Sequence, residues 1–111
     1  MTLSQVSNQE VVNASRKKID ALISIGAGEI LENTLNKVVN YQLTKYKDNI
    51  VQINRELEKF ENTYKMASQE FYRKFEAGEL GDGADFFEWS SLYENIRLYE
   101  GRMKKLESLE A

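Results

Sequence analysis

The feature that most constrains the fold is a regular apolar pattern between residues 39 and 64. Eight apolar or aromatic residues recur there at alternating intervals of four and three, with no polar interruption. They are Val39, Leu43, Tyr46, Ile50, Ile53, Leu57, Phe60 and Tyr64. This pattern is typical of a helix that packs along its length against another helix. With the residues upstream it predicts one helix over residues 29–64, roughly 54 Å long, and hence an elongated molecule.

A second pattern with the same spacing lies between residues 89 and 106. Its positions are Trp89, Leu92, Ile96, Tyr99, Met103 and Leu106. Between the two patterns, residues 68–77 favour a short helix that Gly78 ends, and Asp85 is placed to cap a last helix over residues 86–109. Two patterned helices joined in this way are expected to run antiparallel. The sequence therefore predicts an all-α fold, a coiled-coil-like helical hairpin with an additional N-terminal helix.

The N-terminal helix has its own start signal. Ser7 and Glu10 fit a capping box, and Val6 and Val11 stand at the positions of a hydrophobic staple. After this helix, the segment Gly26-Ala27-Gly28 is open to two interpretations. The favoured one is a helix end and turn, because glycine readily adopts positive φ. The alternative is a helix crossing at which two backbones approach closely.

Composition excludes several kinds of chemistry. The 111 residues contain no cysteine and no histidine, which removes thiol chemistry, disulfides and zinc sites built on those residues. The four carboxylates of residues 79–88 lack the spacing of a calcium loop, and no nucleophile–base pair stands out. The net charge of −3 argues against nucleic-acid binding by this chain alone. We therefore expect no enzyme, no metal, no cofactor, no membrane span and no signal peptide, and a cytoplasmic location.

Ten of the twelve aromatic residues lie between residues 60 and 99, and several flank the glycine-rich loop. The hairpin should bring these side chains together at its closed end. The favoured interpretation is a structural plug that closes the tip, and the alternative is a pocket for an aromatic ligand. The predicted tip residues are Phe71, Phe75, Gly78, Asp85, Phe86, Phe87 and Trp89.

The segment from residue 68 to residue 100, SQEFYRKFEAGELGDGADFFEWSSLYENIRLYE, resembles a group of small helical prokaryotic proteins. Their pattern is E-F-Y-x-[KR]-[FY]-x-x-G-E-L-x-D-x-x-D-F-x-E-W-x-x-L-Y, and residues 26–41 are similar more loosely. The matching positions are Glu70, Phe71, Tyr72, Lys74, Phe75, Gly78, Glu79, Leu80, Asp82, Asp85, Phe86, Glu88, Trp89, Leu92 and Tyr93. The group is associated with small toxins, so the resemblance implies an antitoxin-like partner protein. One departure is Ala67, which stands where the group has a Ser or Thr cap.

The N-terminal third carries apolar residues that the hairpin does not match. Burying such side chains is worth about 1.5–3 kcal/mol each, so a partner surface is expected here. Its predicted residues are Ile19, Leu22, Ile23, Gly26, Gly28, Ile30, Leu31, Leu35 and Val38. We therefore expect one domain over residues 1–111, with an N-terminal helix and glycine break (1–28) and a hairpin (29–111), which forms a homodimer or binds a small toxin. The alternatives are a homo-oligomeric scaffolding bundle without a toxin, and a first helix that packs back within its own chain.

Overall fold

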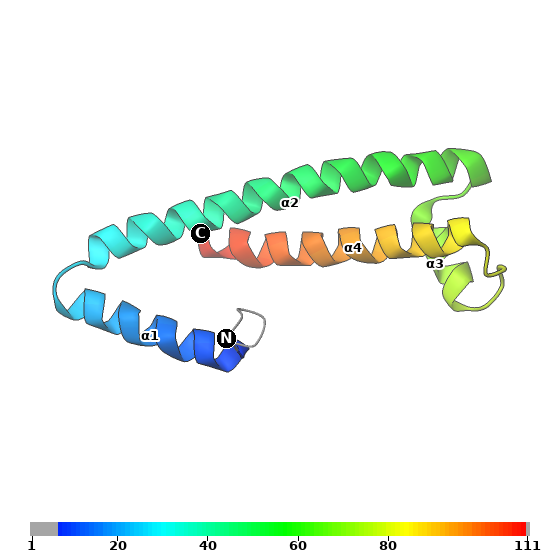
Figure 1. Ribbon diagram of the computed structural model, residues 1–111. Coiled ribbons are helices and arrows are strands. Elements are labelled where there is room, and N and C mark those ends of the chain that lie inside the picture. The colour runs from blue at the N-terminus through cyan, green and yellow to red at the C-terminus, as the bar shows by residue number, and fades with distance from the viewer. Residues whose placement is uncertain (1–6, 111) are drawn as a thin grey trace. The chain divides into compact units, whose positions relative to one another are not determined.

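A computed structural model describes residues 7–110 of the chain (Figure 1). Of these residues 86% are helical and none forms a strand, so the all-α prediction is confirmed. The helices are α1 (Asn8–Ser24), α2 (Gly28–Tyr64), α3 (Ser68–Glu76) and α4 (Ala84–Glu107), followed by the short 3-10 helix η2 (Ser108–Glu110). The chain forms two compact units, Met1–Asn40 and Tyr41–Ala111, so the division falls within α2 rather than at the glycines.

The second unit is the predicted helical hairpin. The part of α2 after residue 40 and the whole of α4 lie side by side and antiparallel (Figure 1). Rings meet across the pair at both ends: Tyr46 and Tyr99 have centroids 5.6 Å apart, and Phe60 and Trp89 5.5 Å apart. None of the fourteen residues of the two apolar patterns is exposed. The heptad spacing therefore identified both faces that form the core.

Glycine ends two of the helices in the manner the sequence predicts. Gly26 has φ of 88°, and its N–H donates to the carbonyl of Ile23 while that of Ala27 donates to Leu22. This pair of bonds is a Schellman motif, which supplies donors to the last carbonyls of α1. Gly78, with φ of 74°, ends α3 in the same way. The turn interpretation of residues 26–28 is confirmed. A Cβ added at Gly26 or Gly28 would meet no described atom within 4 Å, so the described chain gives no close backbone approach there.

The observed starts of the helices agree less well with the sequence predictions than their ends do. The Ser7 hydroxyl accepts from the amide of Glu10 at 3.1 Å, as the capping box predicts, while Val6 of the proposed staple lies outside the described residues. Asp85 is not a helix cap, so that prediction is wrong. Gly83 occupies the N-cap position of α4, and its carbonyl accepts from Phe86 and Phe87. Asp85 instead lies in the first turn, where a carboxylate suits the positive end of the helix dipole.

The start of α3 uses a carboxylate from another helix. Ala67 at the N-cap offers no side-chain acceptor, as its residue type predicts. The amide of Ser68 donates to Glu61 Oε2 of α2 at 2.8 Å. Glu61 also accepts, through its backbone carbonyl, the amide of Met66 at 3.3 Å. One residue of α2 therefore holds both sides of the short connection to α3.

That connection contains the only described non-glycine residue with positive φ. Lys65 has φ of 55°, at the position that ends α2. Left-handed backbone brings the Cβ of an L-residue close to the neighbouring carbonyl, at a cost of about 1–2 kcal/mol. The turn therefore holds Lys65 in a conformation that glycine would adopt without strain.

Candidate functional site

The centre of the hairpin tip is a stack of two fully buried rings. Phe71 of α3 and Trp89 of α4 both have 0% exposure, with centroids 3.8 Å apart and planes inclined by only 5°. The indole Nε1 of Trp89 donates to Ser68 Oγ at 2.9 Å, which satisfies the one polar atom of the indole. Leu57 and Ile96 complete the buried cluster, so the tip has a packed interior.

The other predicted tip residues surround this stack. Phe75 and Phe86 lie with ring centroids 5.5 Å and 5.7 Å from that of Phe71, as the plug interpretation predicts. Phe87 meets the edge of Phe75 at 5.7 Å but remains 55% exposed, so its assignment to the plug is corrected. Phe87 precedes Trp89 by two residues, about 200° around the helix, and therefore faces away from the core.

The sequence prediction missed two residues of α2 at the tip. Phe60 and Tyr64 stack on Trp89 with centroid distances of 5.5 Å and 5.6 Å. Both are the last positions of the first heptad pattern, so an antiparallel register of the two patterns could have placed them here. Ser68, by contrast, gives no signal in the sequence, because its role depends on an indole 21 residues away.

Two tyrosine–carboxylate hydrogen bonds join the helices around the plug. Tyr64 of α2 donates to Asp85 Oδ2 of α4 at 2.7 Å, and Tyr72 of α3 donates to Glu94 Oε1 of α4 at 2.7 Å. The bond to Glu94, and then loss of solvation, raise the pKa of Tyr72 to about 12. The bond to Asp85 likewise raises the pKa of Tyr64 above its usual value. Both phenols therefore act as hydrogen-bond donors that tie helices together.

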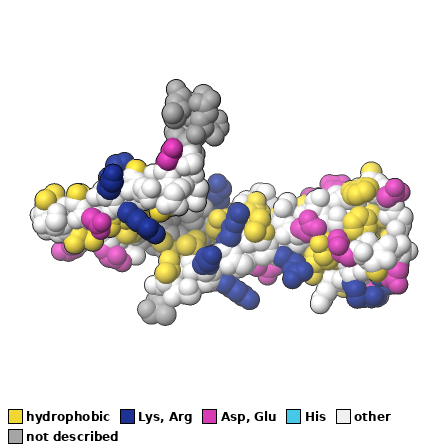
Figure 2. Space-filling model, turned by 90° about the horizontal axis from the view of Figure 1, so that it is seen from below, with side chains coloured by type: hydrophobic (Ala, Val, Ile, Leu, Met, Phe, Trp, Pro, Cys, Tyr) yellow, Lys and Arg dark blue, Asp and Glu magenta, His cyan; other side chains and the backbone are white. Residues whose placement is uncertain are grey.

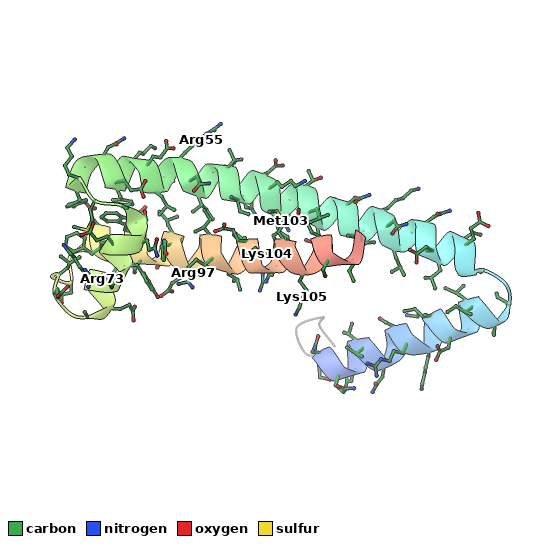
Figure 3. All side chains as sticks on the ribbon, turned by 180° about the vertical axis from the view of Figure 1, so that it is seen from behind. Arg55, Arg73, Arg97, Met103, Lys104 and Lys105 are labelled. Carbon is green, nitrogen blue, oxygen red and sulfur yellow. The ribbon has the colours of Figure 1, made fainter. Side chains whose placement is uncertain are left out.

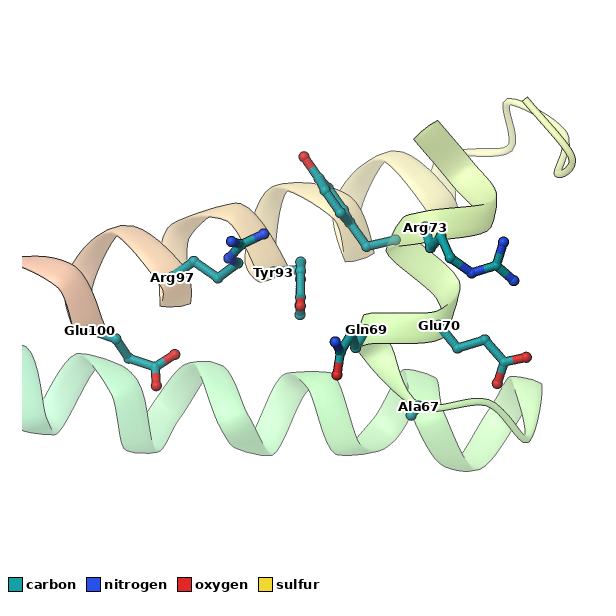
Figure 4. A pocket seen from close by; sticks show the side chains of 8 residues that line it. Ala67, Gln69, Glu70, Arg73, Tyr93, Arg97 and Glu100 are labelled. Carbon is teal, nitrogen blue, oxygen red and sulfur yellow. The ribbon is translucent and has the colours of Figure 1, made fainter. Parts of the chain in front are cut away.

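A groove of about 760 Å³ lies beside the plug (Figure 4). Its walls come from the start of α3 and the middle of α4, and present polar and apolar surface in about equal parts. The lining residues are Ala67, Gln69, Glu70, Tyr72, Arg73, Tyr93, Arg97 and Glu100. Figure 4 shows Gln69, Tyr93 and Arg97 around the opening, while Arg73 extends away from it. The rings of Phe71 and Trp89 do not line this groove, so the buried plug offers no aromatic ligand pocket there.

The predicted partner surface lies in the first unit. No residue of α1 is buried, and several large apolar side chains of α1 and of the start of α2 are exposed. The exposed fractions are Leu22 37%, Ile23 57%, Ile25 77%, Ile30 71%, Leu35 42% and Val38 53%. Ile19 and Leu31 are half-buried. We call the nine predicted residues together with Ile25, which the sequence prediction omitted, the N-terminal surface.

Among the residues that the structure describes, no group of three or more Asp or Glu side chains is arranged to hold a metal ion. None of the helices within residues 7–110 combines the length and apolarity that a membrane crossing requires.

Comparisons of the chain with models of protein families, with curated proteins and with solved structures find no significant match.

Proposed function

We propose that this protein is a non-catalytic protein-interaction module that binds a partner protein through its N-terminal surface. The observation that carries the proposal is the exposure of Ile23, Ile25 and Ile30, each more than half exposed, on adjacent parts of one unit. Contiguous exposed apolar side chains on a soluble protein mark interaction sites. Burial of each such side chain is worth about 1.5–3 kcal/mol, so a partner helix could bind here without further chemistry.

The finer proposal is an antitoxin-like role, in which the surface covers a small toxin. It rests on the resemblance of residues 68–100 to small proteins associated with toxins. In this proposal the aromatic tip keeps the hairpin closed, and the N-terminal surface makes the contact. The alternative is a homo-oligomeric scaffolding bundle, in which copies of the same surface cover one another.

The experiment is affinity purification of the full chain from its native host, with mass spectrometry of the retained proteins. The wild type is compared with Ile23→Glu/Ile30→Glu, which places two charges on the N-terminal surface. The matched control is Val51→Glu, because Val51 is also an exposed apolar residue, at 50%, but lies in the hairpin. A retained partner is then purified and mixed with each variant.

The proposal expects a partner that binds the wild type and Val51→Glu but not the double variant, and whose toxicity in cells the wild type suppresses. Equal binding by all three proteins contradicts it. If the double variant loses only self-association, measured by light scattering, the scaffolding alternative replaces it.

A further inference from the structure

Charge is divided unevenly along α4. Residues 84–96 carry Asp85, Glu88 and Glu94 and no Lys or Arg. Residues 97–107 carry the basic residues Arg97, Arg102, Lys104 and Lys105, and the acids Glu100 and Glu107. The described residues form ion pairs only between Lys59 and Glu56 and between Lys74 and Glu70, so these basic side chains have no such partner. Helix α4 thus has one acidic half and one basic half.

The face of α4 that points away from α2 has a spacing of its own. Exposed residues recur on it at intervals of four and three, from the tip to the end of the helix. They are Phe87, Ser91, Glu94, Leu98, Gly101 and Lys105. In Figure 3, Met103 points toward α2 whereas Lys105 points away from it. We call these six residues the outer α4 face. Phe87 and Leu98 on it are 55% and 47% exposed.

Gly101 is the unusual residue of this face. It lies well inside a helix, where glycine lowers stability relative to alanine. A Cβ added at Gly101 would meet no described atom within 4 Å, so packing in the described chain does not require glycine. Shallow hollows of about 380 Å³ and 240 Å³ lie beside Gly101, lined by Arg97, Leu98, Glu100 and the nearby basic residues. A helix can approach closely at such a position.

We infer that a second copy of this chain docks on the outer α4 face, with the two α4 helices antiparallel about a two-fold axis at the level of Ile96. In this arrangement each residue of one copy lies opposite a residue of the other copy, and the two residue numbers add up to 192. Ser91 then faces Gly101 of the second copy, and two small residues permit close approach of the backbones. Phe87 faces Lys105, a ring and a cation that attract each other. Leu98 lies opposite Glu94 of the second copy, and because each Leu98 is about 3 Å from the level of the axis, the two Leu98 side chains are about 6 Å apart along it and can contact each other.

Charge complementarity identifies the second copy as the occupant. Antiparallel pairing places the acidic half of each α4 against the basic half of the other. Glu88 and Arg102 are fourteen residues apart, two heptads, and so lie on the same flank of the helix. Antiparallel helices bring like flanks together, so Glu88 of one copy lies beside Arg102 of the other, about 3 Å apart in level along the axis. A polyanion such as nucleic acid would suit the basic half only. In Figure 2 acidic side chains are seen at the tip end of the hairpin, together with some basic ones, and further basic side chains lie farther along it.

A two-fold contact of this kind is closed, because the same surface serves both copies. It uses no residue of the N-terminal surface, so it goes beyond the proposed function and does not depend on it. The contact between α4 helices and the binding of a partner by the N-terminal surface can be tested separately in the same full-length protein.

The first experiment is disulfide trapping, which the absence of cysteine from the chain makes specific. Ser91→Cys and Gly101→Cys variants are mixed in equal amounts and oxidised mildly. The arrangement expects a disulfide between the two variants, because positions 91 and 101 face each other. Two copies of Gly101→Cys alone should not crosslink, since their positions are about 15 Å apart along the axis, far beyond the ~7 Å limit between Cα atoms. Gly101→Cys mixed with Lys47→Cys, on the exposed face of α2, is the matched control.

The second experiment is a charge swap followed by light scattering of the full chain. Arg102→Glu and Glu88→Arg should each raise the dissociation constant of the dimer about tenfold or more, because like charges then face each other. The double variant should return to within about threefold of the wild type, as coupled sites do. Lys47→Glu makes the same change of charge elsewhere and should leave the dimer intact.

The proposal is overturned if the wild type is monomeric, if no mixed disulfide forms, or if Gly101→Cys crosslinks equally well with itself. It is also overturned if the charge variants leave the dimer unchanged. If Arg102→Glu instead abolishes binding of a fluorescent DNA duplex without affecting self-association, the basic half of α4 is a nucleic-acid site.

Discussion

The buried indole of Trp89 donates its N–H to the hydroxyl of Ser68, 2.9 Å away, while its ring stacks on Phe71. Ser68 is 5% exposed and begins α3, and Trp89 lies in the second turn of α4. One hydrogen bond therefore fixes how the short helix sits on the long one. The tip combines an apolar interior with this buried hydrogen bond, and its stability should depend on both.

Replacement of Trp89 by alanine should lower the free energy of unfolding by roughly 3–5 kcal/mol, the usual cost of truncating a large buried aromatic residue. The change leaves a cavity against Phe71 and removes the donor to Ser68. Chemical denaturation followed by circular dichroism measures the effect. Tyr41→Ala, at a position that is 67% exposed, is the control and should cost far less. Equal effects of the two substitutions would show that the tip is not packed in solution.

Replacement of Lys65 by glycine should raise stability by about 1 kcal/mol, because glycine adopts the left-handed conformation without strain. The comparison is Lys47→Gly within α2, which should lower stability by about 0.5–1 kcal/mol. Thermal unfolding of both variants shows directly whether each substitution raises or lowers the stability. A loss of stability in Lys65→Gly would mean that the lysine side chain outweighs the backbone strain.

Replacement of Ala67 by serine or aspartate should raise stability by about 0.5–2 kcal/mol. Ala67 already has the extended backbone of an N-cap residue, with φ of −68° and ψ of 147°. The new side chain would accept from the second or third amide of α3, whereas Glu61 already accepts from the first, that of Ser68. The two caps should therefore add, and Glu61→Ala should cost stability in either background. If the stability changes of Ala67→Ser and Glu61→Ala do not add in the variant that carries both substitutions, the two side chains compete for one amide.

Stability should fall as pH rises from about 10 to about 12. The pKa of Tyr72 is raised from 10.0 to about 12 because its phenol donates to Glu94. In this interval the unfolded chain releases a proton that the folded chain still holds, so the contribution is complete below pH 10 and lost above pH 12. The pKa of Tyr64 is also raised, by its hydrogen bond to Asp85, so its contribution to stability is lost in the same direction. Melting temperatures across this range should fall less steeply for Tyr72→Phe, and the exposed Tyr41→Phe should behave as the wild type.

The heptad positions were predictable because they depend only on residue type and spacing. Leu57 and Ile96 fell on the two patterns and are buried, and Gly26 and Gly78 fell at helix ends and have positive φ. Such features need no knowledge of distant residues. Periodicity therefore predicted the helices and the hairpin almost completely.

The errors came from competition between local signals and from distant partners. Asp85 has the residue type of a cap, but Gly83, two residues earlier, occupies that position while Asp85 accepts from Tyr64. Phe87 precedes Trp89 by two residues and so lies on the opposite side of the helix, and the exposure of Phe87 could have been predicted from this spacing. The contact between Glu61 and Ser68 could not, because no periodic pattern marks a single carboxylate that reaches a helix start.

Trp89 is the single tryptophan of the 111 residues, and it is fully buried between aromatic rings. The intrinsic fluorescence of the protein under tryptophan excitation therefore comes from one place, the centre of the hairpin tip. An indole in such apolar surroundings emits at shorter wavelength than one in water, and its emission changes as soon as α3 leaves α4. Opening of the tip can thus be followed in real time without any label, and separately from events at the first 40 residues.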